Sequence, residues 1–280
     1  EGWGFESSLG HLFLLFFGIF TNLSAQEIVS KIELSKEVHE TSGLELVDDN
    51  LITLNDSGNP ASLYYLNYNG EIIFERNFDY LQNNDWEDLA ADDKFIYIAD
   101  FGNNFDTRDN LRIIKVPINT ENNSIELINF NYPEQYDFGF KQISSYDAEA
   151  LISYENNLII FTKNRAKQIT EIYKVSKAPG NYKAELIGMI DVESIVTAAD
   201  YDAQKRLLVL TSTSDLNEYY IITIENFDIL EIDKISLNKF KIPIGKTQVE
   251  SIKIIDKSNF WITSEAEIFG SPEMYKVNID

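Results

Sequence analysis

The sequence has no cysteine and only two histidines, His11 and His39. Without thiols the chain can form neither disulfides nor thiolate metal sites, and a cysteine nucleophile is excluded. Two histidines are too few for a histidine-based metal site, and they leave a catalytic triad with its own histidine close to impossible. Glycine-rich phosphate loops, dinucleotide fingerprints and nucleophile elbows are also missing. The common enzyme signatures are therefore absent.

Proline is scarce, with six residues in 280, and no stretch rich in proline or serine suggests a linker between domains. Hydrophobic residues make up 44% of the chain and aromatic residues 13%, which is enough for a folded core. The sequence therefore predicts one domain.

Positive charge is also scarce: 23 Lys and Arg face 46 Asp and Glu, a net charge of −23. A field of this sign repels phosphate backbones and acidic membrane surfaces, and it concentrates cations near the protein. We therefore expect the protein to bind cationic ligands and not nucleic acid.

The one long apolar run is Leu12–Phe20, which is followed by the small and polar residues 21–25. This pattern is typical of a secretory signal peptide cleaved after Ala25, and the run is too short to span a bilayer. Glu1 and Glu6 replace the usual basic start and there is no initiator Met, so we interpret the start as truncated or misassigned.

Residues 26–280 would then form a single exported domain, periplasmic or extracellular, with no transmembrane segment and a net charge of −21 from 44 acidic and 23 basic residues. We expect this mature chain to be a monomer.

One short phrase recurs roughly every fifty residues: a small or acidic residue, followed two positions later by an aliphatic or small residue that opens a strand. Its copies are Ser42-Gly43-Leu44, Glu87-Asp88-Leu89, Glu149-Ala150-Leu151, Thr197-Ala198-Ala199 and Glu250-Ser251-Ile252. A fixed period of this length indicates a repeat architecture.

Each copy is followed by alternating apolar runs separated by turn residues, which predicts four strands in each repeat. In the third repeat these runs are 158–162, 171–175 and 182–190, and in the fourth they are 207–211, 220–224 and 229–236. The fifth repeat lacks an outer strand, which Ile28–Leu34 would supply. We therefore predict an all-β, five-bladed β-propeller whose ring is closed by the N-terminal strand. Six blades are the alternative if 119–145 hides a degenerate blade, and a β-sandwich is a further one.

In a propeller the first strand of each blade lines the central channel. Glu87, Glu149 and Glu250 occupy equivalent positions in three blades, and Ser42 and Thr197 occupy the other two. Carboxylates gathered this closely require a cation or shared protons, and an all-oxygen shell suits Ca²⁺ or Mg²⁺. Alternatively, each Glu accepts backbone N–H groups of the next blade and staples the ring.

A second set of polar residues follows the ends of the second strands, where scaffolds commonly place binding groups. In Asp100–Asn104, followed by Arg108, Gly and Asn allow the positive φ values of an ion-cradling turn; an ordinary Asx turn with a structural arginine is the alternative. Lys163 and Arg165 could receive an anionic substrate group or form salt bridges. The candidates for the mouth of the pocket are Ser42, Asn55, Asp56, Asp100, Asn103, Asn104, Arg108, Lys163, Arg165, Thr197 and Glu265.

Segments 85–89 (DWEDL) and 96–104 (IYIADFGNN), with Arg108, Thr41–Leu44 and Asn55–Gly58, resemble a group of exported propeller proteins. The wider resemblance is to SMP-30/NHL-like propellers and, in the five-blade count, to calcium-activated nucleotidases. The SMP-30-like resemblance implies a divalent cation for lactone hydrolysis, held by Glu87, Asn103 and Asp100. The nucleotide-binding residues of the nucleotidases are not recognisable in this sequence.

Two functions remain open. The first is a non-catalytic binding module that presents a cation-stabilised mouth to a small molecule, a glycan, a peptide or an envelope protein. The second is a metal-dependent hydrolase of a phosphoester, lactone or similar anionic substrate, with Glu149 or Glu250 as general base. No organic cofactor is indicated.

Overall fold

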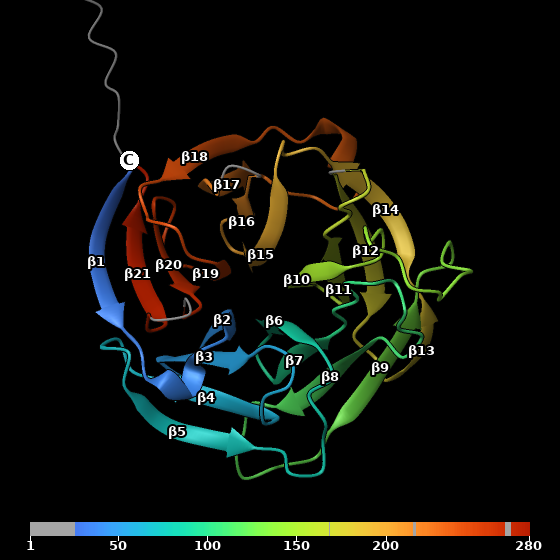
Figure 1. The fold of residues 1–280 in the computed structure, drawn as a ribbon, viewed down its shortest axis with the longest axis horizontal. Helices are drawn as coiled ribbons and strands as arrows, with labels where there is room; N and C mark the ends of the chain where they lie inside the picture. The colour runs from blue at the N-terminus through green and yellow to red at the C-terminus, as the bar shows by residue number, and fades with distance from the viewer. Residues whose placement is uncertain (1–25, 168, 215–216, 267–269) are drawn as a thin grey trace, which may run out of the picture.

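The computed structural model describes residues 26–167, 169–214, 217–266 and 270–280 and shows five blades around a central axis, each with four strands, and one blade gains a fifth strand at its outer edge (Figure 1). This confirms the predicted five-bladed β-propeller. The predicted signal peptide lies outside the described residues. Within the described part of the chain, no helix is long and apolar enough to cross a membrane.

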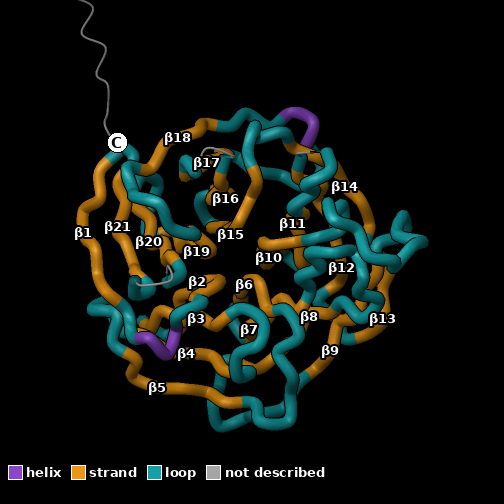
Figure 2. The backbone as a smooth tube through the Cα atoms, in the orientation of Figure 1, coloured by secondary structure: helices purple, strands orange, loops and turns teal. Residues whose placement is uncertain are grey.

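The blades follow one another along the chain, and each begins with its innermost strand (Figure 2). Blade 1 contains β2 (Thr41–Val47), β3 (Asn50–Asn55), β4 (Ser62–Leu66) and β5 (Ile72–Asn77); blade 2 contains β6 (Trp86–Ala91), β7 (Phe95–Asp100), β8 (Arg112–Pro117) and β9 (Glu126–Asn131). Blade 3 contains β10 (Ala148–Tyr154), β11 (Asn157–Thr162), β12 (Thr170–Ser176) and β14 (Glu185–Ile190); blade 4 contains β15 (Ile195–Asp202), β16 (Leu207–Thr213), β17 (Tyr219–Glu225) and β18 (Asn238–Ile242). Two 3₁₀ turns, η1 (Lys36–Val38) and η2 (Ile232–Lys234), lie between strands.

Blade 5 joins the two ends of the described chain. It contains β19 (Val249–Ile254), β20 (Asn259–Ser264), β21 (Glu273–Asn278) and, as its outermost strand, β1 (Glu27–Glu33). β1 pairs antiparallel with β21 from Glu27 opposite Asn278 to Glu33 opposite Glu273. Figure 1 shows this blue strand beside the red one. The predicted ring closure is confirmed, and it covers the edge that β21 would otherwise expose.

The structure rules out the six-blade alternative and corrects two of the predicted outer strands. Segment 119–145 does not hide a sixth blade, because it supplies β9, the outer strand of blade 2, and then a long loop. The predicted run 182–190 divides at Ala184, whose N–H donates to Asn131 O at 2.9 Å. The part before the break, β13 (Gly180–Lys183), pairs in parallel with β9 of the preceding blade.

The predicted strand 229–236 is also displaced, since the outer strand of blade 4 is β18. Residues 232–234 form η2 instead, with local hydrogen bonds such as Lys234 N to Glu231 O at 2.9 Å. Ile232 is buried in the apolar cluster between blades 3 and 4, so its hydrophobicity reflects packing between blades rather than a strand.

The core consists of five apolar clusters, each shared by two neighbouring blades. Between blades 2 and 3, for example, Tyr97 and Ile113 pack with Leu151 and Tyr173. Burial between blades therefore holds the ring together and leaves its axis to polar side chains.

Candidate functional site

The repeated phrase marks a β-bulge in each innermost strand. In four blades the first residue of the phrase is left out of the ladder, whereas in blade 1 Ser42 still pairs with Leu54 and the irregularity lies at Gly43 and Leu44. The pairing register shifts between Ser42 and Glu45 in blade 1, and at the other four blades it shifts around Glu87, Glu149, Thr197 and Glu250. A bulge leaves one residue outside the ladder and re-aims its side chain. The repeat therefore places one polar residue per blade at a common level of the channel.

A cavity of about 310 Å³ opens at this level. It is lined by Glu40, Ser42, Asp56, Glu87, Asn104, Glu149, Lys163, Arg165, Gln248, Glu250 and Glu265. The structure thus gathers the three glutamates of the repeat and most of the predicted mouth residues; we call this space the axial cavity. Thr197 lines an adjoining space of about 150 Å³, which shares Lys163, Gln248 and Glu250 with the axial cavity.

The two cations of the lining already have acidic partners. Lys163 Nζ lies 2.8 Å from Glu149 Oε1, and Arg165 Nη2 lies 3.4 Å from Asp147 Oδ2. Arg165 also donates to Asn104 Oδ1 at 3.0 Å. These contacts correspond to the salt-bridge alternative for Lys163 and Arg165, although Glu265 is not their partner.

Glu87 has no such partner in the part of the chain that the structure describes. Its side chain is only 5% exposed, and its carboxylate accepts no hydrogen bond from any described residue. Burial, together with the nearby carboxylates of Glu149 and Asp56, holds the pKa of Glu87 well above its usual range. An ionised Glu87 would therefore need a positive charge that the described residues do not supply.

The pKa values of other acidic groups that line the cavity or neighbour Glu87 are shifted in the same direction. Burial raises the pKa of Asp56 and of Asp85 to about 6, and it raises the pKa of Glu265 to about 7. Burial and the neighbouring Glu149 raise the pKa of Asp147 to about 7. Burial also raises the pKa of Glu250, against the opposing effect of Lys163. The site therefore exchanges protons near neutral pH.

Among the described residues, two groups of carboxylates could hold a metal ion, and Glu87 belongs to both. Asp56, Asp85 and Glu87 form one group, while Glu87, Asp147 and Glu149 form the other; within each, one oxygen of every residue lies within 4.8 Å of the others. Oxygen donors of this kind suit hard cations. Glu250 lines the cavity without joining either group.

Asp85 and Asp147 were missed by the sequence analysis. Each stands two positions before a bulge glutamate: Asp85 before Glu87, and Asp147 before Glu149. The same position is also polar in two other blades, where Glu40 precedes Ser42 and Gln248 precedes Glu250. A search for this second polar position within the repeat would have found them.

Acidic residues farther along the same strands bond to the next blade. Glu45 accepts from Ala91 N at 3.1 Å, Asp88 accepts from Leu151 N at 2.8 Å, and Asp200 accepts from Ile254 N at 2.7 Å. Glu87, Glu149 and Glu250 accept no backbone N–H among the described residues. The hydrogen bonds between blades that were considered for these three glutamates are therefore made by Glu45, Asp88 and Asp200.

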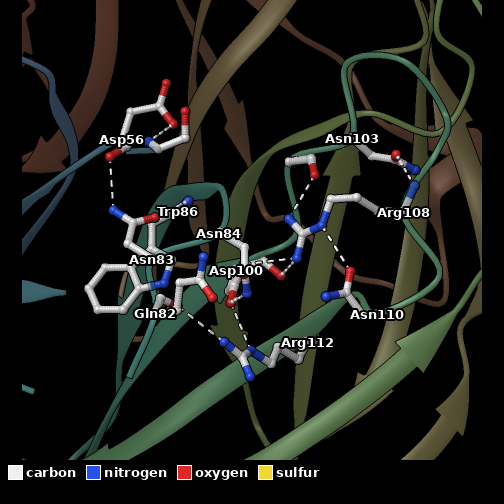
Figure 3. Close-up of polar contacts among 12 residues, drawn as sticks. Asp56, Gln82, Asn83, Asn84, Trp86, Asp100, Asn103, Arg108, Asn110 and Arg112 are labelled. Carbon is white, nitrogen blue, oxygen red and sulfur yellow. Dashed lines mark hydrogen bonds and ion pairs between the residues drawn. The ribbon is translucent and has the colours of Figure 1, made fainter. Parts of the chain in front are cut away.

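Besides Thr197, four predicted mouth residues do not line the axial cavity. Asp100 is fully buried and pairs with Arg108 at 2.9 Å and Arg112 at 2.7 Å (Figure 3). Asn103 accepts from Arg108 N at 2.9 Å, and its own N–H donates to Asp147 Oδ1 at 2.8 Å. These three residues therefore support the loop that carries Asn104 and orient Asp147.

The fourth residue, Asn55, donates from Nδ2 to Glu37 O at 2.7 Å and accepts from Glu40 N at 3.2 Å. It fixes the chain beside Glu40. Of the three residues that the SMP-30-like resemblance implies as metal ligands, only Glu87 faces the cavity.

Glycine is required at position 102 for a different reason from the one that the sequence suggested. Residues 102–104 have no positive φ, so the backbone conformation expected for an ion-cradling turn is not formed there. A Cβ on Gly102 would lie 2.0 Å from Glu87 Oε1 and 2.5 Å from Asp85 Cγ. Glycine is needed there because two acidic side chains approach the backbone.

No protein-family model matches the sequence, and no curated protein matches it. Solved β-propellers are similar in fold. The PQQ-bound aldose sugar dehydrogenase of Streptomyces coelicolor aligns with a TM-score of 0.50 and 8% identity over 91% of this chain and 98% of that one. The Pan2 WD40 domain of Neurospora crassa gives 0.39 and 10% over 85% and 75% of the two chains.

A protein of unknown function from Bacteroides thetaiotaomicron gives a TM-score of 0.44 and 8% identity over 91% of this chain and 72% of that one. At 8% identity the likeness to the aldose sugar dehydrogenase concerns the fold alone. Any function must therefore be argued from the axial cavity.

Proposed function

We propose that the protein is an exported, non-catalytic binding module whose axial cavity takes a divalent cation, Ca²⁺ or Mg²⁺. The buried, unpartnered carboxylate of Glu87 carries this proposal. A buried charge is costly unless it is paired, and further carboxylates stand within ligand distance of Glu87. A hard cation would satisfy Glu87 and relieve the repulsion among its neighbours.

The two candidate ligand groups are not equivalent. In the group of Glu87, Asp147 and Glu149, two members already face a cation. Asp147 faces Arg165 and Glu149 faces Lys163. In Asp56, Asp85 and Glu87 no ion pair within 4.0 Å neutralises any member among the described residues. The charge balance therefore favours the group of Asp56, Asp85 and Glu87 as the cation site, with Glu87 as the central ligand.

The hydrolase alternative depended on Lys163 and Arg165 as receptors for an anionic substrate. Both are engaged by acidic residues, with Lys163 Nζ 2.8 Å from Glu149. Glu149 is likewise held by a cation and is a poor general base in this arrangement. The binding-module function therefore has the better support. The proposal of export rests on the Leu12–Phe20 pattern alone.

Thermal unfolding in excess chelator, followed by titration with millimolar Ca²⁺, Mg²⁺ and Mn²⁺, tests the cation. Binding to the native state alone gives a saturable stabilisation of about 2.7 kcal/mol when the free ion reaches about 100 times its Kd. We expect Glu87→Gln to abolish this gain and to raise Tm in chelator, because it removes a buried repulsion. The control is Glu121→Gln, an exposed loop position. No stabilisation of the wild-type protein by any of the three ions would contradict the proposal.

A further inference from the structure

Two exposed phenylalanines stack on each other near the axial cavity. Phe105 is 50% exposed and Phe140 is 67% exposed, with ring centroids 4.9 Å apart. They lie on separate loops, 101–111 and 132–147, which are joined by Lys141 N donating to Phe105 O at 3.0 Å. Gln135 Nε2 also donates to Asp106 O at 2.8 Å. The Phe105–Phe140 pair is thus an exposed apolar surface on two loops that hydrogen bonds hold together.

The backbone connects this surface to the rim of the cavity. Asn104 lines the cavity and is held by Arg165, and Phe105 is the next residue along the chain. Tyr136 and Ile143, which are 88% and 60% exposed, lie on the same loop as Phe140. Clustered exposed apolar side chains of this kind mark interaction sites.

The charge of the cavity restricts the partner. Six carboxylates line it against two cations, giving a formal surplus of four negative charges when all are ionised, and Glu87 is unpartnered among the described residues. A second copy of this chain is disfavoured, because residues 26–280 of each copy have a net charge of −21. Charge complementarity instead favours a partner with positive charge beside an apolar group.

We propose that the axial cavity and the Phe105–Phe140 pair together form a docking surface for a protein segment that carries a Lys or Arg side chain next to an aromatic or apolar residue. The basic side chain enters the cavity toward Glu87, and the apolar side chain packs on the two rings. This inference rests on the proposed function, since the same carboxylates receive the positive charge. A divalent cation and the basic segment therefore compete.

Fluorescence anisotropy at low ionic strength tests the surface with the labelled, C-terminally amidated peptide GFRFG. The matched peptides GFQFG and GARAG lack the charge and the aromatic groups, respectively. We expect each to bind at least about tenfold more weakly, as central charged and aromatic anchors do at interfaces. The double variant Phe105→Ala with Phe140→Ala should weaken GFRFG binding by a similar factor. The control Leu230→Ala, at an 85% exposed position outside the surface, should leave it unchanged.

Millimolar Ca²⁺ should displace the GFRFG peptide. Equal affinity for GFRFG and GFQFG, or wild-type affinity in the double phenylalanine variant, would overturn the docking proposal. It would also be overturned if Ca²⁺ stabilised the protein while GFRFG failed to bind, although the proposed cation site would then stand. Selective binding of GFRFG without any effect of divalent cations would support docking and contradict the cation site.

Discussion

Glu87 and Asp88 are adjacent in sequence, yet their carboxylates have opposite environments. Asp88 accepts two backbone N–H groups, from Leu89 at 2.7 Å and Leu151 at 2.8 Å, while Glu87 accepts none from the described residues. The bulge at Glu87 turns it toward the cavity. The repeat reveals Glu87 because its position recurs. Asp88 becomes recognisable as a staple only once the neighbouring blade is placed beside it.

Gly102→Ala should disturb the site without changing any acidic residue. Its Cβ would lie 2.0 Å from Glu87 Oε1, so the glutamate or the loop must move. Overpacking of this kind costs about 1–3 kcal/mol. We expect a lower Tm in chelator and a weaker gain from divalent cations, both measured by thermal unfolding. Gly245→Ala is the control, because its Cβ would meet nothing within 4 Å. Unchanged cation stabilisation in Gly102→Ala would show that Glu87 does not bind the ion from this position.

Lys253 should matter for stability rather than for binding. Its Nζ lies 2.6 Å from Glu45 Oε2 and 2.8 Å from Asp200 Oδ1, and all three side chains are at most 15% exposed. Removing one partner of a buried ion pair leaves uncompensated charge and costs about 3–5 kcal/mol. We therefore expect Lys253→Met to lower the free energy of unfolding in urea by about this amount.

Lys257→Met serves as the comparison for Lys253→Met. Lys257 is 63% exposed and its nearest acidic oxygen is 3.8 Å away, so its loss should leave stability nearly unchanged. Similar unfolding curves for the two variants would show that the Glu45–Lys253–Asp200 network contributes little.

At the scale of elements, the inner strands were easier to predict than the outer ones. Inner strands carry the repeated phrase and are mostly buried, as in β10, so their pattern is continuous. The outer strand β18 is mainly exposed or half-buried and has a weak pattern, while the more apolar segment 229–236 packs between blades. Strand β13 was missed because its partner β9 is a parallel neighbour from the preceding blade. Pairing between blades leaves no local pattern in the sequence.

Strand β1 offers a direct test of ring closure. A chain that begins at residue 35 would lose β1 and expose the edge of β21, along with apolar contacts made by Ile28 and Ile32. Exposed strand edges promote association. We expect this truncation to aggregate or to unfold at a much lower temperature in size-exclusion and thermal experiments. A chain that begins at residue 26 keeps β1 and should stay monomeric; identical behaviour of the two would refute the closure argument.

At the scale of the whole molecule, stability arises from burial between blades while acidic charge is concentrated at the axis. The five apolar clusters close the ring without a single disulfide, since the chain has no cysteine. Several axial carboxylates are thereby held in a buried, mutually repulsive environment. Composition predicted an acidic protein, but only the assembled ring shows which acids oppose one another.

This arrangement predicts that the cation-free protein loses stability as pH rises from 5 to 8. Asp56 and Asp85 titrate near 6, and Asp147 and Glu265 near 7, above their ordinary values of 3.8 and 4.5. The folded state therefore binds more protons than the unfolded state across this range, and the free energy of unfolding falls with pH. Carboxylates with lowered pKa, such as Asp92, are ionised in both states above pH 5 and add no slope.

Urea unfolding in chelator at pH 5, 6, 7 and 8 measures the effect, which we expect to be several kcal/mol, because each of the four groups contributes more than about 1 kcal/mol over this range. Asp147→Asn should flatten the slope, because it removes a fully buried group that titrates in the window. A bound divalent cation should oppose the loss, so the stabilisation by Ca²⁺ should be larger at pH 8 than at pH 5. If stability instead rose steadily from pH 5 to 8 in chelator, the axial carboxylates would have to be ionised and paired in the native state, and the need for a cation at Glu87 would disappear.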